Sequence, residues 1–294
     1  IANSPNGKVN IITHSMGGLL VKQYLSQATS TDFLDKLVLA GIPEFGAPVI
    51  FKVLTEGDNL GFTIGPLEVL NTGRAKEITQ NMPGVYELLP SRKYLDINPI
   101  LRSPQPSPSY VLDLRGGANR YLNYDETNQF MTSNPTNARN QNLLNDTDVF
   151  HSTLDNFQFP ASKTYRLVGC TNPTTIGSFG IYNGDTIKVQ TTKGDGTVPL
   201  PSALATSTFF GSPNVPNAYF ILDRDSDHLG LVKNSSTIDL IDNIFNNAVG
   251  QLPSLISTSS ADCFNQLSSL SYVQVSTHGS ATLDVFDSAS RHVG

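Results

Sequence analysis

The five residues Thr13-His14-Ser15-Met16-Gly17 constrain the fold of this chain more than any other segment. They follow a β-branched run at residues 9–12, which predicts a short strand, and they precede residues 18–25, whose apolar spacing predicts a helix. Gly17 and Gly18 let the start of the helix pass close to the strand. A strand, a tight turn and a helix hold the Ser15 hydroxyl at a helix N-terminus, where a developing negative charge is favoured.

This order of elements is typical of a Gly-x-Ser-x-Gly turn, the nucleophile elbow, in which the serine is exposed on a strained backbone. Thr13 occupies the position of the first glycine but keeps a small side chain. The alternative is an ordinary Ser-Met-Gly-Gly turn between a strand and a helix. A base and an acid elsewhere in the chain would distinguish the nucleophile elbow from an ordinary turn.

Composition limits the function classes. The chain has 294 residues, enough for one α/β domain with an appendage. Its 25 acidic residues outnumber 19 basic ones, for a formal net charge of −6, and no Lys/Arg run occurs, so a nucleic-acid partner is not expected. No apolar run approaches the roughly 18 residues of a membrane span. The chain begins with Ile1, so we expect its natural beginning to lie upstream.

Cysteine usage leaves two possibilities open. Cys170 and Cys263 either pair or remain free thiols, and their spacing fits no zinc site. Few lysines with abundant Ser, Thr and Asn favour an extracellular or cell-surface location. We expect no cofactor and no metal.

The apolar pattern predicts an α/β fold with a mostly parallel sheet and helices on both faces. Continuous apolar runs at residues 36–41, 164–169 and 218–222 predict buried strands beside residues 9–12. Residues 50–162, with helices at 51–54 and 67–70, are too long for a connection and predict a cap insertion. A hairpin is predicted at residues 181–189.

Two further segments follow. Ser235 or Ser236 is expected to cap a helix that closes one side of the sheet, with an apolar face of Ile238, Ile241, Ile244, Phe245 and Ala248. We place the catalytic domain at residues 1–250. Residues 251–294 are a linker followed either by the start of an accessory β domain, with strands at 273–275 and 283–286, or by a disordered tail.

A serine nucleophile needs a base and an acid that orients the base. Of the five histidines, only His228 follows the last predicted sheet strand in a loop. His14 adjoins the nucleophile and is expected to point elsewhere. The others lie in the cap or in the terminal appendage: His151, His278 and His292.

Asp195 is the predicted acid, because Gly194 and Gly196 let the backbone bring its carboxylate close to an imidazole. Its rivals are Asp185, Asp223, Asp225 and Asp227. A plain Gly-Asp-Gly turn or a calcium loop is the alternative, but no further carboxylates stand at suitable spacing.

An oxyanion hole needs two N–H donors, and the Met16 amide is predicted to be one. The other normally comes from a loop upstream of the elbow, which residues 1–8 do not supply. We therefore expect a fragment that lacks its first strands and is poorly active alone, since losing one donor costs about 100- to 1000-fold in rate.

Several segments together resemble the lecithin–cholesterol acyltransferase-like branch of the α/β-hydrolases. They lie between residues 9 and about 249: residues 14–18, 46–48, 81–90 (NMPGVYELLP), 194–199 (GDGTVP), 227–228 and 231–234. The resemblance implies an α/β-hydrolase fold, a Ser15–Asp195–His228 triad and an acyl ester substrate of lipid type. It leaves open whether the acyl group passes to water or to an acceptor alcohol.

Substrate contacts are expected in the cap. An apolar cluster there consists of Phe62, Ile64, Leu67, Val69 and Leu70. Phe62 and Leu67 are the predicted substrate-binding residues, and the nearby Gly61 and Gly65 are the predicted hinges. The cluster either covers the acyl chain and makes transient contact with a lipid surface or is ordinary cap core. Two other functions remain open: a non-catalytic surface or adhesion module on a degenerate hydrolase, and a hydrolase of non-lipid substrates such as a polyester depolymerase, an esterase or a peptidase.

Overall fold

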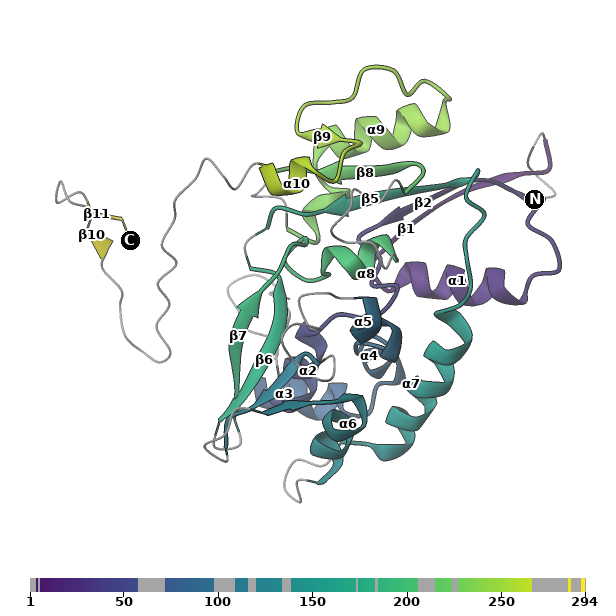
Figure 1. Cartoon of the computed structure of the whole chain (residues 1–294). Coiled ribbons are helices and arrows are strands. Elements are labelled where there is room, and N and C mark those ends of the chain that lie inside the picture. The colour runs from purple at the N-terminus through teal and green to yellow at the C-terminus, as the bar shows by residue number, and fades with distance from the viewer. Residues whose placement is uncertain are drawn as a thin grey trace.

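A computed structural model describes most of the chain (Figure 1). The described residues are 4, 6–57, 72–97, 109–115, 120–133, 139–172, 174–182, 185–205, 215–223, 227–265, 285–286 and 292–293. In this part of the chain, no helix is long and apolar enough to cross a membrane.

A five-stranded sheet forms the centre of the fold, in the order β1-β2-β5-β8-β9. The first four strands run parallel, and β9 joins antiparallel to β8. This sheet confirms the predicted α/β class and the predicted strands. Their bounds are β1 Val9–His14, β2 Leu34–Ala40, β5 Thr164–Gly169, β8 Ala218–Ile221 and β9 Ile256–Ser257.

Helices cover both faces of this sheet (Figure 1). Leu37 and Leu39 of β2 pack in one cluster with Leu19 and Leu25 of α1 (Gly17–Gln27). The alternate residues Val38 and Ala40 pack with the helix α9 (Ser235–Phe245) on the opposite face. The two-residue alternation of a strand therefore divides the apolar run of β2 between two helical layers.

Helix α9 lies where the sequence predicts it, but its cap and buried face differ from the prediction. Asn234 is the N-cap, and its side chain accepts a hydrogen bond from the Ser236 amide. Leu240 and Ile244 are buried, whereas Ile238 is 50% exposed. Ile244 of the predicted stripe is buried, and Ile241 and Phe245 pack partly buried against the same cluster, so this part of the prediction is confirmed. The structure differs at Ile238 and Ala248, which are exposed, because only contacts with the sheet decide which side of the helix is covered.

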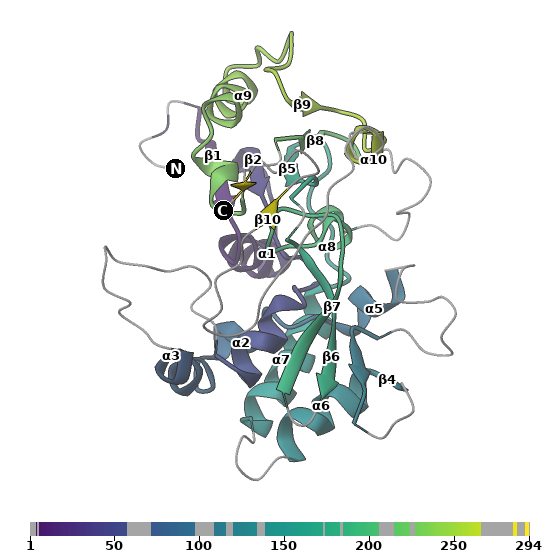
Figure 2. The same ribbon diagram turned by 90° about the vertical axis from the view of Figure 1, so that its left-hand side faces the viewer.

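The cap forms a second lobe below the central sheet (Figures 1 and 2). Its second sheet has the order β4-β3-β6-β7, in which β3 pairs parallel with β6. The strands are β3 Val111–Asp113, β4 Arg120–Leu122, β6 Ile176–Tyr182 and β7 Asp185–Thr191. The helices are α2 Val49–Thr55, α3 Thr72–Thr79, α4 Pro83–Tyr86, α5 Arg92–Ile97, α6 Tyr124–Ser133 and α7 Gln141–Leu154.

The cap therefore extends beyond the predicted limits of 50–162. The β6–β7 hairpin is confirmed, but it belongs to the cap, because Val111 of β3 pairs with Phe179 of β6. Phe51, Tyr110 and Phe179 pack their rings together in the cap core. Of the two predicted cap helices, residues 51–54 lie in α2, whereas residues 67–70 lie outside the described residues.

The segment after residue 250 is joined to the central sheet. Ile256 of β9 pairs with Ile221 of β8, and a disulfide joins Cys170 to Cys263 in α10 (Asp262–Asn265). The predicted boundary at residue 250 is therefore too early for the sheet, because the Ser-rich composition changes before the packing ends. Beyond it, β10 (Val285–Phe286) pairs with β11 (His292–Val293), and residues 273–275 lie outside the described residues.

Candidate active site

Ser15 stands in the turn between β1 and α1. Its φ of 55° is in the left-handed region, which a non-glycine residue rarely adopts, so the backbone is strained as the elbow pattern predicts. The Ser15 amide donates a hydrogen bond to the Ala40 carbonyl at the end of β2. Met16 is the N-cap residue of α1, so its amide lies among the first N–H groups of a helix, which have no intrahelical partner.

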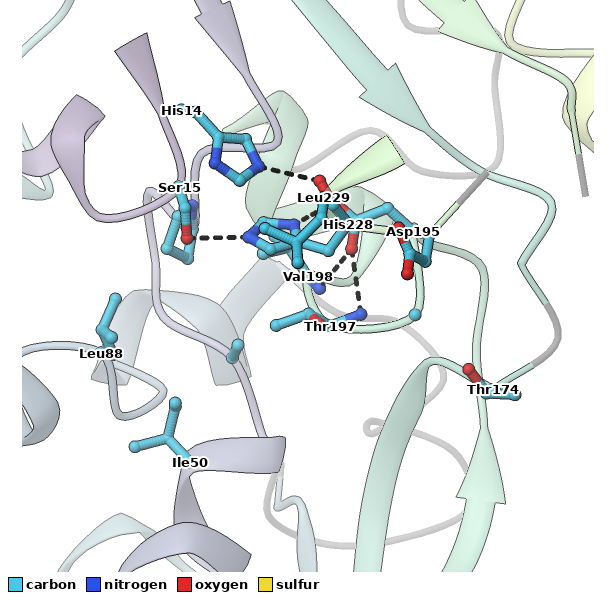
Figure 3. A pocket seen from close by; sticks show the side chains of 14 residues that line it. His14, Ser15, Ile50, Leu88, Thr174, Asp195, Thr197, Val198, His228 and Leu229 are labelled. Atoms are coloured by element: carbon cyan, nitrogen blue, oxygen red, sulfur yellow. Dashed lines mark hydrogen bonds and ion pairs between the residues drawn. The ribbon is translucent and has the colours of Figure 1, made fainter. Parts of the chain in front are cut away.

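The structure brings together three side chains, from the turn after β1, the loop after β7 and the loop after β8. Nε2 of His228 lies 2.8 Å from Oγ of Ser15, and Nδ1 of His228 lies 2.8 Å from Oδ2 of Asp195. Figure 3 shows the imidazole between the other two groups. Since a carboxylate only accepts, Nδ1–H donates to Asp195, and Nε2 accepts from the Ser15 hydroxyl.

Asp195 is buried, with 1% of its surface exposed. Its Oδ1 accepts hydrogen bonds from the amides of Thr197 at 3.0 Å and Val198 at 2.7 Å. Amide donors of this kind stabilise the charged form of a carboxylate. The carboxylate is therefore fixed on one oxygen by the backbone and presents the other to His228.

The rival carboxylates face other groups. Asp223 accepts from the Asn234 side chain, and Asp227 accepts from the Gly230 amide. Asp225 and the side chain of Asp185 lie outside the described residues.

Two glycines at strand ends make room for the triad-like arrangement. A Cβ on Gly169, at the end of β5, would lie 2.6 Å from Cβ of Asp195. A Cβ on Gly41, after β2, would lie 2.9 Å from Oδ2 of Asp195 and 3.2 Å from Cε1 of His228. These two glycines are not among the residues predicted from the sequence, although both predicted apolar runs end in glycine, which is the signal that marks them.

His14 does not point away from the site, so that expectation is wrong. Its ring centroid lies 4.5 Å from that of His228, and its Nε2 lies 2.8 Å from the His228 carbonyl oxygen (Figure 3). Burial, followed by the neighbouring His228, lowers the pKa of His14 below its ordinary value of 6.5. The prediction failed because no sequence pattern shows that the loop after β8 folds back over the end of β1.

The remaining histidines lie elsewhere. His151 is buried in α7 between the Asp155 carboxylate and the Glu87 carbonyl, at 3.0 Å from each. His292 belongs to β11, and His278 lies outside the described residues.

A buried cluster of charges supports the loop that follows β2. Glu44, which is 1% exposed, forms ion pairs with Lys22 of α1 at 2.8 Å and with Arg166 of β5. Burial alone would raise the pKa of Glu44, but the two cations outweigh it and hold that pKa below its ordinary value. The cluster ties α1, β5 and the loop together, and no spacing in the sequence predicts this pairing.

A cavity of about 370 Å³ opens at Ser15. One wall is apolar and consists of Pro43, Ala47, Ile50 and Leu88. The rest of the lining includes the apolar Val198 and Leu229 and polar groups at Thr174, Thr197 and Asp227. The predicted contacts Phe62 and Leu67 lie outside the described residues. In the described part of the chain, no three His, Cys, Asp or Glu side chains are grouped to hold a metal ion.

Comparisons with known proteins give one family match. The model of the lecithin:cholesterol acyltransferase family matches residues 1–202. No curated protein gives a significant match. Among solved structures, a chain from the crystal structure of the Tle4–Tli4 complex matches with a TM-score of 0.49 and 15% sequence identity, covering 76% of this chain and 54% of that chain. The family match spans more than half of the sequence, and the chain therefore belongs to the lecithin:cholesterol acyltransferase family.

Proposed function

We propose that this chain is a serine esterase, lipase or O-acyltransferase that cleaves lipid-type carboxylic esters through an acyl-enzyme on Ser15. The observation that carries the proposal is the continuous hydrogen-bond path from Ser15 through His228 to the buried Asp195. The lecithin:cholesterol acyltransferase family model supports an acyl ester as substrate.

In the first half of the reaction, Nε2 of His228 takes the hydroxyl proton while Oγ of Ser15 attacks the ester carbonyl carbon. Asp195 holds the imidazole in the tautomer with hydrogen on Nδ1 and stabilises the imidazolium that forms. The carbonyl oxygen becomes an oxyanion and accepts from the Met16 amide at the N-terminus of α1. The imidazolium then gives its proton to the leaving alcohol, which leaves the acyl group on Ser15.

In the second half, an acceptor hydroxyl attacks the acyl-enzyme while His228 takes its proton. The resulting tetrahedral intermediate collapses, the proton returns to Oγ of Ser15, and the product leaves. Water as acceptor gives a carboxylic acid, and an alcohol gives a new ester. Both reactions use the same three side chains, so the choice depends on which acceptor occupies the cavity.

The shape of the cavity supports an apolar acyl group. Ile50 and Leu88 face the space beside Ser15 from the cap side (Figure 3). Apolar walls with a few polar groups are typical of small-molecule sites, in which the polar groups fix the orientation. We propose that the acyl chain lies along this wall and that the alcohol portion lies towards Thr174 and Thr197.

The test is turnover of a series of p-nitrophenyl esters of increasing acyl length, with water alone and with an added alcohol. We expect turnover that depends on Ser15, together with an acyl-enzyme detected by intact mass. Ser15→Ala should lose both the turnover and the acyl-enzyme while keeping the wild-type melting temperature. Wild-type turnover that survives in Ser15→Ala would contradict the proposal. Low turnover alone is also expected where one oxyanion donor is missing, so it is the absence of any acylation at Ser15 that would favour a non-catalytic binding module.

The disulfide supports a further proposal on location. A pair such as Cys170–Cys263 persists in oxidising compartments. We propose that the protein works outside the cell or at its surface and that residues 1–265 form the catalytic unit. Thiol alkylation before and after reduction, on protein from its native source, tests the first point, because a reduced pair in freshly isolated protein would contradict it.

A further inference from the structure

The end of β1 contacts the site twice. Ser15 meets the His228 side chain, and the preceding residue His14 meets the His228 main chain, with 2.8 Å between Nε2 of His14 and the carbonyl oxygen. Two adjacent residues at the end of β1 therefore contact the main chain and the side chain of the same histidine (Figure 3).

The partner requires a hydrogen on Nε2 of His14. A carbonyl oxygen only accepts hydrogen bonds, so Nε2 of His14 carries the hydrogen and donates it. The residues around His228 belong to a short loop, in which the Asp227 carbonyl accepts from the Leu231 amide. Through the His14 bond, β1 holds the main chain of this loop at His228.

We propose that His14 is a positioning residue, which fixes the main chain of His228 and thereby keeps the imidazole within hydrogen-bond reach of Ser15. This inference rests on the proposed function. Catalysis depends on the geometry of the base, and an error of about 1 Å in position costs about 100-fold in rate. A hydrogen bond from the residue next to the nucleophile couples the two groups more directly than packing of a distant element does.

The electrostatics of the contact agree with this role. The ring centroids of His14 and His228 are 4.5 Å apart, so a charged His14 would repel the imidazolium that His228 becomes during the reaction. Asp195 is the carboxylate that faces the pair, and it is bonded to His228. A neutral His14 holds the loop without opposing the charge that forms beside it.

The experiment compares His14→Gln, whose amide nitrogen reaches about as far as Nε2, with His14→Asn, which is one methylene shorter, and His14→Phe, which has no donor. We expect His14→Gln to keep kcat within about threefold of the wild type. We expect His14→Asn and His14→Phe to lose about 10- to 100-fold in kcat with little change in KM.

The pattern across the variants decides the question. Equal kcat in His14→Gln and His14→Asn would overturn the inference, as would a rise in KM with unchanged kcat. If His14→Phe does not fold, the two amide variants still decide, because they differ only in reach. If the wild type lacks Ser15-dependent turnover, the proposed function fails, and this inference fails with it.

Discussion

Asp195 and His228 are joined through one carboxylate oxygen, at 2.8 Å, while the other oxygen of Asp195 is held by two backbone amides. The carboxylate is buried and cannot turn without losing those amide bonds. Its direction therefore sets the tautomer of His228 and leaves Nε2 free of hydrogen to accept from Ser15.

Asp195→Asn should lower kcat by about 1000- to 10,000-fold, because an amide group at this position stabilises the wrong imidazole tautomer. The measurement is kcat on a short soluble ester, with circular dichroism to check the fold. Asp239→Asn on the exposed side of α9 is the matched control and should keep wild-type activity. Near-normal activity of Asp195→Asn would show that another carboxylate orients the base.

Gly169→Ala should lower kcat by about 10- to 100-fold while KM changes little. The added Cβ would meet Cβ of Asp195 at 2.6 Å and its Cα at 3.2 Å, so the main chain that carries the acid has to move. Gly250→Ala is the control, since its Cβ would meet its nearest neighbour at an ordinary 3.9 Å. Equal steady-state kinetics for the two variants would contradict this account of the strand end.

Glu44→Gln should reduce the free energy of unfolding by about 3–5 kcal/mol, because it leaves the buried Lys22 and the partly buried Arg166 without their carboxylate. Urea denaturation measures the change. Asp125→Asn removes the ion pair with Arg92, whose side chains are 74% and 55% exposed, and should cost less than about 1 kcal/mol. A similar small loss in both variants would mean that the buried cluster adds no stability.

Glu44 should also make the stability of the folded chain depend on pH. The pKa of Glu44 is lower in the folded chain than its ordinary value of 4.5, so the unfolded chain binds this proton first on acidification. The stability that Glu44 contributes is complete above pH 4.5 and falls as the pH drops below that value. Unfolding midpoints between pH 6 and 3 should therefore fall more steeply in the wild type than in Glu44→Gln. Parallel curves would contradict the assignment.

The strands and the helix after Ser15 follow from the sequence because local periodicity determines them. The run at residues 36–41 is apolar throughout, and β2 is covered on both faces. The elbow around Ser15 is equally local, since small residues, a strand and a helix are all adjacent in the chain. Glycines on both sides of Asp195 singled out this carboxylate among several.

Other features depend on contacts between distant segments, which local patterns do not encode. The β6–β7 hairpin is visible in the sequence, but its pairing with β3 joins residues 68 positions apart, such as Val111 and Phe179. The ion pairs of Glu44 and the contact between His14 and His228 are of the same kind. Composition alone predicts that a residue such as Glu44 is exposed to solvent, and it predicts no role for His14.

The most direct measurement of the central claim is labelling of the protein with a fluorophosphonate, followed by peptide mapping. We expect one adduct on Ser15, because its hydroxyl is hydrogen-bonded to Nε2 of His228, and we expect Ser15→Ala and His228→Gln to lose the label while remaining folded. A stoichiometric adduct on a different serine, or full labelling of Ser15→Ala, would contradict the claim that Ser15 carries the acyl group.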